Sequence, residues 1–177
     1  MVKLYRTVAL VGMMGAGKSA LGRRLAHKLN VPFHDADAEI ERAAGCSISE
    51  IFARYGEPAF RDGERRVIAR LLGEEPHILA TGGGAFIDPE TRERFKESAV
   101  SVWIKAPVDV LLERTSRRDS RPLLRDGNPR DTLERLLATR EPIYAQADVT
   151  IDSEEGPHHI AVDQIIEALK QKGILAE

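Results

Sequence analysis

Cysteine and long apolar runs are both scarce in this chain. Cys46 is the single cysteine, which excludes an intrachain disulfide and a zinc site built from several cysteines. One cysteine also suits a reducing compartment. The longest apolar run near the start, Val8–Val11, is far below the roughly 20 residues that a membrane helix requires, and no signal-type apolar segment precedes the glycines that follow. We therefore expect a cytoplasmic protein that is complete from its first strand and does not enter a membrane.

An excess of charge of one sign is missing as well. The chain has 177 residues, with 26 Lys and Arg against 28 Asp and Glu, and a formal net charge of −2. Without a basic excess, nothing pulls the whole chain onto nucleic acid or an anionic membrane, so we expect neither as a partner. The sequence shows no internal repeat and no flexible linker. We predict one domain over residues 1–177, large enough for an ordinary hydrophobic core and acting as a monomer.

Short apolar runs alternate with amphipathic stretches along the chain. Val8–Val11 is a continuous apolar run that ends at a glycine, which is typical of a strand buried on both faces. Leucines then recur every four residues between Lys18 and Leu29, which indicates a helix. Further strands are expected at Val31–His34, His77–Thr81, Val100–Ile104 and Val149–Ile151. The alternation predicts a three-layer α/β fold, in which helices cover both faces of a parallel sheet.

Capping residues mark the starts of several expected helices. Ser47 followed by Glu50 fits a capping box, and Asp88 and Asn128 each precede a proline at the first helical position. Residues 115–128 break the pattern, because they are polar, rich in arginine and without apolar periodicity. Long loops inside compact domains are usually functional, so we interpret this segment as a long loop or lid.

The segment from Gly12 to Ser19 matches G-x-x-x-x-G-K-[ST] between a buried strand and an amphipathic helix. Glycines let backbone N–H groups approach phosphate oxygens, and the helix N-terminus adds partial positive charge. Lys18 is placed to reach the β- and γ-phosphates of a nucleoside triphosphate, and the Ser19 hydroxyl to bind Mg²⁺. Motors, GTPase switches and small-molecule kinases share this cradle, so it leaves the reaction open. We expect the nucleotide to contact Gly15, Ala16, Gly17, Lys18, Ser19 and Ala20.

Two further groups of residues follow expected strands, at the sheet edge where ligands bind in parallel α/β folds. Asp35 and Asp37 come after the second strand, where two carboxylates can hold Mg²⁺ waters, or one can accept a proton from an attacking hydroxyl. An alternative role for these aspartates is to cap the N-terminus of the next helix. That role would account for one of the two and leave the other unexplained. Gly82, Gly83 and Gly84 follow the third strand, and three glycines in a row indicate that a ligand approaches the backbone.

Arginine side chains supply the remaining candidates, because guanidinium forks suit carboxylate and phosphate groups. Arg61 and Arg140 stand outside the polar segment, and Arg121 stands inside it. Arg121 is followed by Pro122-Leu123-Leu124, a rigid apolar anchor within an otherwise polar stretch. The neighbouring arginines, for which we expect the role of solvated surface charges, are Arg117, Arg118 and Arg125.

Together these motifs resemble the shikimate kinase family in order and spacing, from about Thr7 to about Leu169. The matching segments are the glycine cradle, Asp35-x-Asp37, Phe60-Arg61-x-x-Glu64, the three glycines, Arg121-Pro122-Leu123-Leu124 and Arg140-x-Pro142-x-Tyr144. The resemblance implies a nucleoside-monophosphate-kinase-like fold with five parallel strands in the order 2-3-1-4-5. It also implies transfer of the γ-phosphoryl group of ATP, with Mg²⁺, to the 3-hydroxyl of shikimate, on the chorismate route to aromatic amino acids.

The resemblance further implies a role for each matching residue. Asp37 would hydrogen-bond the shikimate hydroxyls and act as a base or orienting group. Arg61 and Arg140 would hold the shikimate carboxylate. The further implied contacts are Gly82, Gly83 and Gly84 with shikimate, Arg121 with the ATP phosphates, Arg114 with the adenine, and Glu64 with Arg61.

Two other functions are weighed against this one. A gluconate-kinase-like enzyme would share the cradle and lack the two-arginine carboxylate site, whereas a regulatory nucleotide-binding module would not need an intact Asp37, Lys18 and Arg121. The chain departs from the family pattern at Ala20, at Asp62-Gly63 and at Glu141. None of these departures removes a matched functional side chain, although the charge of Glu141 would weaken the positive field at Arg140.

Overall fold

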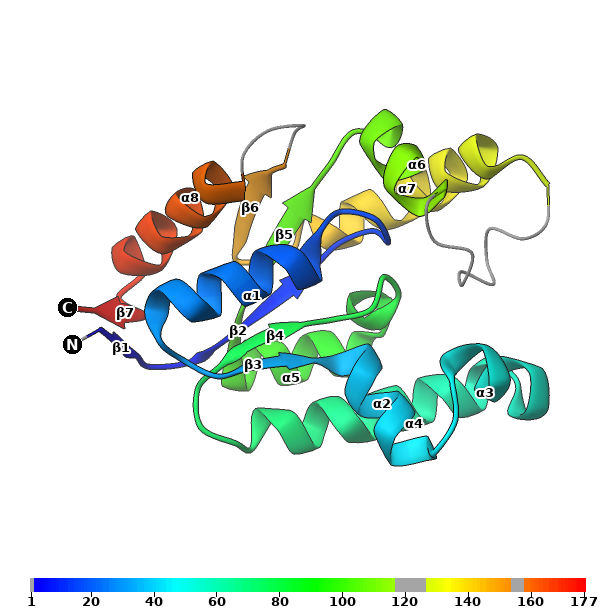
Figure 1. The fold of residues 1–177 in the computed structure, drawn as a ribbon, viewed down its shortest axis with the longest axis horizontal. Helices are drawn as coiled ribbons and strands as arrows, with labels where there is room; N and C mark the ends of the chain where they lie inside the picture. The colour runs from blue at the N-terminus through cyan, green and yellow to red at the C-terminus, as the bar shows by residue number, and fades with distance from the viewer. Residues whose placement is uncertain (1, 117–126, 154–157) are drawn as a thin grey trace.

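The structure, a computed structural model, describes residues 2–116, 127–153 and 158–177. A five-stranded sheet runs through its centre (Figure 1). All of the strand pairings in this sheet are parallel, and the strand order is β3-β4-β2-β5-β6. Counted along the chain within this sheet, the order is 2-3-1-4-5, as expected. The strands are β2 Thr7–Val11, β3 Phe33–Asp35, β4 Ile78–Ala80, β5 Ala99–Lys105 and β6 Val149–Asp152.

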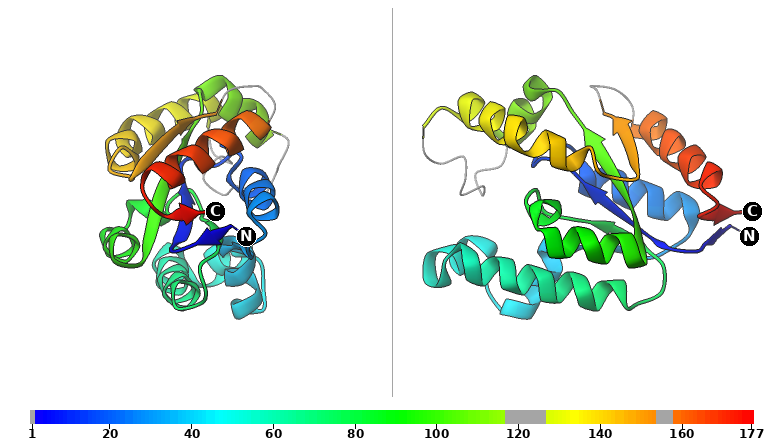
Figure 2. Two further views of the ribbon diagram at one scale, coloured as in Figure 1. Left: turned by 90° about the vertical axis from the view of Figure 1, so that its left-hand side faces the viewer. Right: turned by 180° about the vertical axis from the view of Figure 1, so that it is seen from behind.

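Helices cover both faces of this sheet, which confirms the three-layer α/β architecture (Figures 1 and 2). Helices α1 and α8 pack against each other on one face, and α5 packs on β5 from the other face with α4 beside it. The α-helices are α1 Lys18–Leu29, α2 Ala36–Ala44, α3 Ile48–Tyr55, α4 Glu57–Leu72, α5 Pro89–Ser98, α6 Val108–Ser116, α7 Pro129–Tyr144 and α8 His158–Gln171. A 3-10 helix, η1, spans Ala85–Ile87.

The N-cap side chains expected at the starts of three helices are confirmed. The Ser47 hydroxyl accepts a hydrogen bond from the Glu50 backbone N–H at 3.1 Å and begins α3. Asp88 and Asn128 cap α5 and α7 in the same way, each before a proline. These bonds satisfy backbone donors that have no partner within the helix.

The second strand of the sheet differs from its expected bounds of Val31–His34. Asn30 adopts a left-handed conformation with φ 55°, and the Val31 N–H donates to the Ala26 carbonyl oxygen at 3.0 Å. Val31 therefore completes the end of α1 and cannot begin a strand, so β3 starts at Phe33 and extends through Asp35. A further strand pair was not expected at all: β1 (Lys3–Leu4) and β7 (Leu175–Ala176) pair antiparallel and hold the two ends of the chain together (Figure 1).

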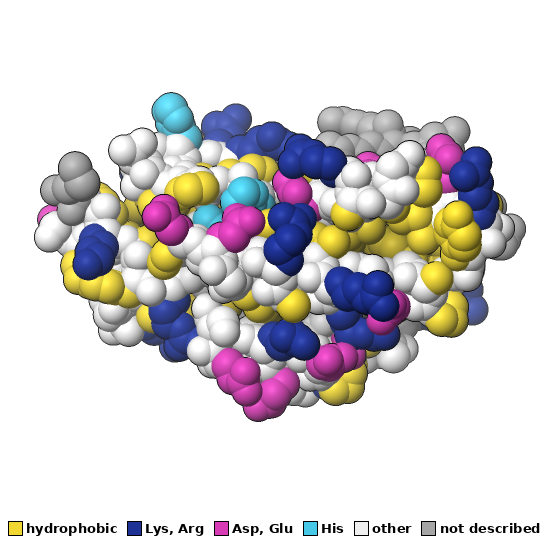
Figure 3. Space-filling view, turned by 90° about the horizontal axis from the view of Figure 1, so that it is seen from below, with side chains coloured by type: hydrophobic (Ala, Val, Ile, Leu, Met, Phe, Trp, Pro, Cys, Tyr) yellow, Lys and Arg dark blue, Asp and Glu magenta, His cyan; other side chains and the backbone are white. Residues whose placement is uncertain are grey.

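The core lies between the sheet and the helices; every residue of β2 is buried, and Val8–Val11 belong to the core. Trp103, Met13 and Met14 belong to it. Figure 3 shows acidic and basic side chains interspersed on one face of the molecule, in keeping with the nearly balanced charge. Within the described residues, no helix combines the length and the apolar character needed to cross a membrane.

Candidate active site

The glycine cradle joins the end of β2 to the start of α1. Gly12, Gly15 and Gly17 have φ values of 139°, 82° and 95°, which favour glycine over any residue with a β-carbon. Lys18, the first residue of α1, donates through Nζ to the carbonyl oxygens of Gly12 and Met13. The cradle therefore gathers the lysine and the N-terminus of a helix at the edge of the sheet where the strands end.

Arg114 of α6 braces the cradle from outside. Its Nη1 donates to the Ala16 carbonyl oxygen at 2.8 Å and is 3.4 Å from that of Gly15. A β-carbon on Gly17 would lie 2.9 Å from the same nitrogen. Ala16 itself is buried, whereas Ala20 lines the space beside the cradle.

Two adjoining cavities open at this edge of the sheet. The first, here called the cradle cavity, has a volume of about 270 Å³ and lies against Lys18, Arg114 and His158. The second, the arginine cavity, has a volume of about 360 Å³ and lies against Arg61 and Arg140. The residues that line both cavities are Ser19, Asp35, Asp37, Gly82 and Gly83. These residues therefore stand where a ligand in one cavity would meet a ligand in the other.

Asp35 and Asp37 take different positions at this junction. Asp35 caps α2, because its Oδ1 accepts from the backbone N–H of Asp37 at 3.0 Å and of Ala38 at 3.3 Å. Its other oxygen, Oδ2, accepts a hydrogen bond from the Ser19 hydroxyl at 2.8 Å. Asp35 thus combines the capping role with a link to the cradle, and Asp37, one residue into α2, lines both cavities.

The three glycines after β4 each leave room for a different side chain of the site. A β-carbon on Gly82 would lie 2.9 Å from Asp37 Oδ1, and one on Gly83 would lie 3.5 Å from Arg140 Nη1. A β-carbon on Gly84 would lie 2.6 Å from Arg61 Nη1. Approach of a ligand to the backbone was the expected reason for this run of glycines, and the structure adds the close approach of the protein's own charged groups.

Arg61 and Glu64 form the ion pair implied by the resemblance. Both lie on α4, three residues apart, with Arg61 Nη1 3.0 Å from Glu64 Oε1. Only 2 % of the Glu64 side chain is exposed. Burial raises the pKa of the Glu64 carboxyl above its ordinary value of 4.5 and outweighs the lowering by Arg61, while Asp37 and Asp88 raise it further.

Arg140 lines the arginine cavity from α7, whereas Arg61 lines it from α4. Arg140 is 8 % exposed, and its Nη1 is buried without a hydrogen-bond partner among the described residues. Glu64 Oε2 is likewise buried and has no hydrogen-bond partner among these residues. A buried guanidinium nitrogen without a partner favours an anionic ligand. Glu141, whose charge was expected to weaken the field at Arg140, lies 3.4 Å from Lys105 Nζ, which offsets that charge.

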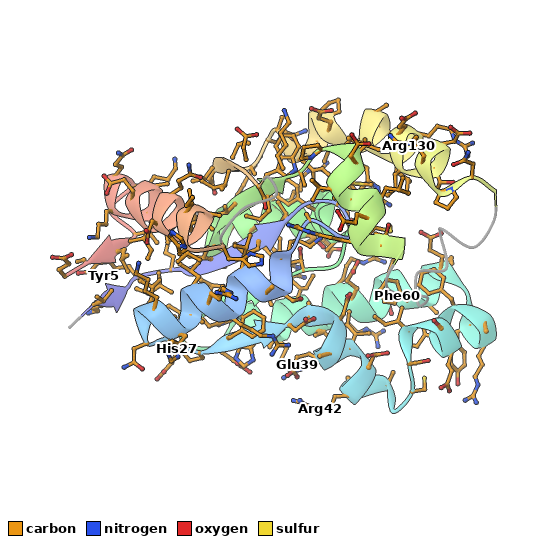
Figure 4. All side chains as sticks on the ribbon, turned by 45° about the horizontal axis from the view of Figure 1, so that its top comes forward. Tyr5, His27, Glu39, Arg42, Phe60 and Arg130 are labelled. Atoms are coloured by element: carbon orange, nitrogen blue, oxygen red, sulfur yellow. The ribbon has the colours of Figure 1, made fainter. Side chains whose placement is uncertain are left out.

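Several residues that line the site were not among the expected contacts. Phe52 and Phe60 lie with their ring centroids 4.9 Å apart and line the arginine cavity. Figure 4 shows Phe60 at the opposite end of the molecule from Tyr5 and the chain termini. The apolar pattern of α3 could have placed Phe52 on a buried face, but it could not have placed the ring in a cavity. His158, the first residue of α8, also lines the cradle cavity.

Arg121 and residues 117–126 of the expected lid lie outside the described residues. Among the residues that the structure does describe, no group of three or more histidine, cysteine, aspartate or glutamate side chains is arranged to hold a metal ion. The oxygen atoms of Ser19, Asp35 and Asp37 nevertheless line both cavities together. Oxygen donors of this kind, completed by waters and phosphate oxygens, are what Mg²⁺ prefers.

A glycine cradle between β2 and α1, in a five-stranded parallel sheet of this order, defines a P-loop kinase with a second, substrate-sized cavity beside the cradle. The family model of shikimate kinase matches residues 14–170. A shikimate kinase of Caulobacter vibrioides is 59% identical over 166 residues, which cover 94% of this chain and 83% of the relative. One of Paramagnetospirillum magneticum is 56% identical over 167 residues, covering 94% and 86%. The chain belongs to the shikimate kinase family.

Solved structures agree with this assignment. Shikimate kinase from Acinetobacter baumannii in complex with shikimate superposes with a TM-score of 0.91 at 39% identity, over 94% of each chain. A gluconokinase from Sinorhizobium meliloti, at 18% identity and a TM-score of 0.62 over 96% of this chain and 94% of its own, shares the fold alone. The comparisons therefore favour the shikimate kinase interpretation over the gluconate-kinase-like alternative.

Proposed function

We propose that this chain transfers the γ-phosphoryl group of ATP to the 3-hydroxyl of shikimate and releases ADP and shikimate 3-phosphate. The observation that carries the proposal is the common wall of the two cavities. One cavity has the phosphate cradle, the other has two arginines for a carboxylate, and Asp37 lies between them. Phosphoryl transfer needs positioning and charge neutralisation more than covalent help, and this arrangement provides both.

Arg61 and Arg140 hold the shikimate carboxylate in this proposal. They come from different helices, α4 and α7, and line the same cavity. The buried Arg140 Nη1, which has no partner among the described residues, is matched by a carboxylate oxygen, and Glu64 keeps Arg61 oriented through their 3.0 Å ion pair. Two guanidinium groups on one carboxylate orient the ring as well as bind it. Phe52 and Phe60 supply the apolar side of the cavity.

Asp37 holds the hydroxyl that attacks the γ-phosphorus and accepts or orients its proton. Lys18 leaves the cradle carbonyls for the β- and γ-phosphates, and Arg121, assigned from its sequence motif, neutralises the charge of the transferring group. Ser19, Asp35 and Asp37 are the residues that would hold Mg²⁺, which supplies further positive charge to the phosphates. Arg114 and His158, at the cradle cavity, would border the rest of the nucleotide.

The cellular setting is proposed on the same basis. We assign residues 1–177 to one catalytic domain that acts as a monomer in the cytoplasm and requires neither nucleic acid nor a membrane. The net charge of −2 and the interspersed surface charges support the expectation that neither nucleic acid nor a membrane is a partner.

The test is an assay that couples ADP release to a spectroscopic signal. The purified chain is supplied with ATP and Mg²⁺ and with shikimate, gluconate or no acceptor. We expect ADP release only with shikimate. Release with gluconate alone would favour the related kinase, release without any acceptor would contradict the transfer reaction, and a chain that binds ATP without turnover would favour the regulatory module.

A further inference from the structure

Tyr144 is the last residue of α7 and follows Arg140 by four residues, so both side chains leave the same face of the helix. The tyrosine is fully buried. Its hydroxyl donates a hydrogen bond to the carbonyl oxygen of Gly83, in the run of glycines after β4. The hydrogen bond thus joins the helix that carries Arg140 to a backbone segment that is distant in sequence.

Gly83 lies where three parts of the site meet. A β-carbon there would be 3.2 Å from the backbone nitrogen of Met14, in the cradle, and 3.5 Å from Arg140 Nη1. Gly83 also lines both the cradle cavity and the arginine cavity. A change in the position of its backbone therefore alters the separation between the cradle and Arg140.

The tyrosine ring is itself held firmly. Its centroid lies 5.8 Å from that of Trp103 on β5, and both rings belong to the buried core. Burial raises the pKa of the Tyr144 hydroxyl above its ordinary value of 10.0, although Arg140 and Arg61 oppose this shift. The hydroxyl consequently keeps its proton and remains a donor at neutral pH.

We propose that Tyr144 is a positioning residue for the acceptor substrate. Its hydrogen bond to the Gly83 carbonyl fixes the backbone of the three glycines. The same bond keeps Arg140 at the distance from the cradle that phosphoryl transfer requires. This inference rests on the proposed function, because it takes Arg140 and Gly83 as contacts of shikimate. Tyr144 itself lines neither cavity. It acts on the reaction through the two residues that it holds.

The test compares Tyr144→Phe with a matched control, Ser101→Ala. Phenylalanine keeps the ring and its packing and removes only the hydroxyl. Ser101 is also buried, and its hydroxyl accepts a hydrogen bond from the backbone N–H of Asp148, 47 residues away, at 3.0 Å. This bond does not involve Gly83. Tyr144→Phe loses the hydrogen bond to Gly83, and Ser101→Ala loses the two hydrogen bonds of its hydroxyl to Asp148, so both variants should be less stable in thermal unfolding.

We expect the two variants to differ in their kinetics. Tyr144→Phe should raise the KM for shikimate about three- to tenfold, the change expected for one neutral hydrogen bond. Its KM for ATP at saturating shikimate should stay within about twofold of the wild type, because the cradle keeps its own contacts. Ser101→Ala should leave both constants unchanged. Calorimetric titration of shikimate should show the same loss of affinity without turnover.

A Tyr144→Phe protein that loses stability as Ser101→Ala does, with no change in the shikimate KM, would overturn the positioning role. Equal rises in both KM values would overturn it too, since they would indicate a general loosening of the fold. Arg140→Lys separates this outcome from a failure of the proposed function. If Arg140→Lys raises the shikimate KM and Tyr144→Phe does not, only the positioning role fails; if neither does, the carboxylate site itself is wrongly assigned.

Discussion

Replacing Gly84 with alanine should displace Arg61 without disturbing the rest of the site. A β-carbon at this position would lie 2.6 Å from Arg61 Nη1 and 2.7 Å from Cζ. Ordinary contact needs at least 3.4 Å, so the guanidinium must move by about 1 Å. Only the far end of a flexible side chain has to give way, and 20% of the Arg61 side chain is already exposed. We therefore expect the variant to fold.

The consequence for binding follows from the hydrogen bonds that such a movement breaks. Arg61 would lose its 3.0 Å bond to Glu64 Oε1 and, in the proposed complex, its bond to the shikimate carboxylate. A hydrogen bond to a charged group contributes about 1.5–3 kcal/mol, which corresponds to about a ten- to hundredfold rise in the KM for shikimate. The KM for ATP should hardly change, because Arg61 does not line the cradle cavity.

Gly63→Ala is the matched control for this experiment. Gly63 lies in α4 two residues from Arg61, and apart from the adjoining helix backbone no atom of the described residues is within 4 Å of the position that its β-carbon would take. Alanine should stabilise the helix there by up to about 1 kcal/mol and leave both KM values unchanged. The measurements are the ADP-release assay with each substrate varied in turn and thermal unfolding of both variants.

One outcome would refute the reasoning. If Gly84→Ala is folded and its shikimate KM equals that of the wild type, Arg61 does not hold the carboxylate. A rise in the ATP KM of the same size would mean that the substitution distorts the junction between the cavities.

The remaining predictions concern the attacking hydroxyl, the metal and acid stability. Asp37→Asn should leave ATP binding nearly intact and reduce turnover by a factor of 10² or more, the usual contribution of proton transfer, as measured in the same assay; retained turnover would make Asp37 a structural residue. Asp35→Ala should lower the thermal midpoint through loss of the α2 cap, worth about 1 kcal/mol, and raise the Mg²⁺ concentration needed for half-maximal turnover. Burial lowers the pKa of His77 below its ordinary value of 6.5. The unfolded chain therefore takes up this proton first, and the free energy of unfolding should fall as the pH drops below about 6.5, a slope that His77→Asn should reduce in urea titrations.

Local sequence signals were sufficient where the interacting atoms lie within a few residues of each other. The bounds of α1, the caps at Ser47, Asp88 and Asn128, and the cradle all depend on hydrogen bonds between close neighbours along the chain. Backbone conformation and side-chain capping are local properties, so a single sequence reveals them. The strand order came from the family resemblance and is confirmed by the sheet.

The dual contacts of Asp35 illustrate what a sequence alone leaves open. Its capping role was one of two readings, and only the fold shows that the same carboxylate also accepts a hydrogen bond from Ser19, 16 residues away. The β1–β7 pair could not be predicted from the sequence either, because strands of two residues show no periodicity. They pair only because the fold brings the two ends of the chain together.

By itself the sequence determined the cradle, the acidic pair and the arginines as separate candidates, since each is a residue type in a recognisable local setting. The tertiary structure decided that Arg61 of α4 and Arg140 of α7 line one cavity, that this cavity shares a wall with the cradle, and that Tyr144 is bonded to Gly83. Arg61 and Arg140 are 79 residues apart in the sequence, and Gly83 and Tyr144 are 61 residues apart. They exist only once the helices have packed on the sheet, because burial and close packing, not chain proximity, bring the groups together.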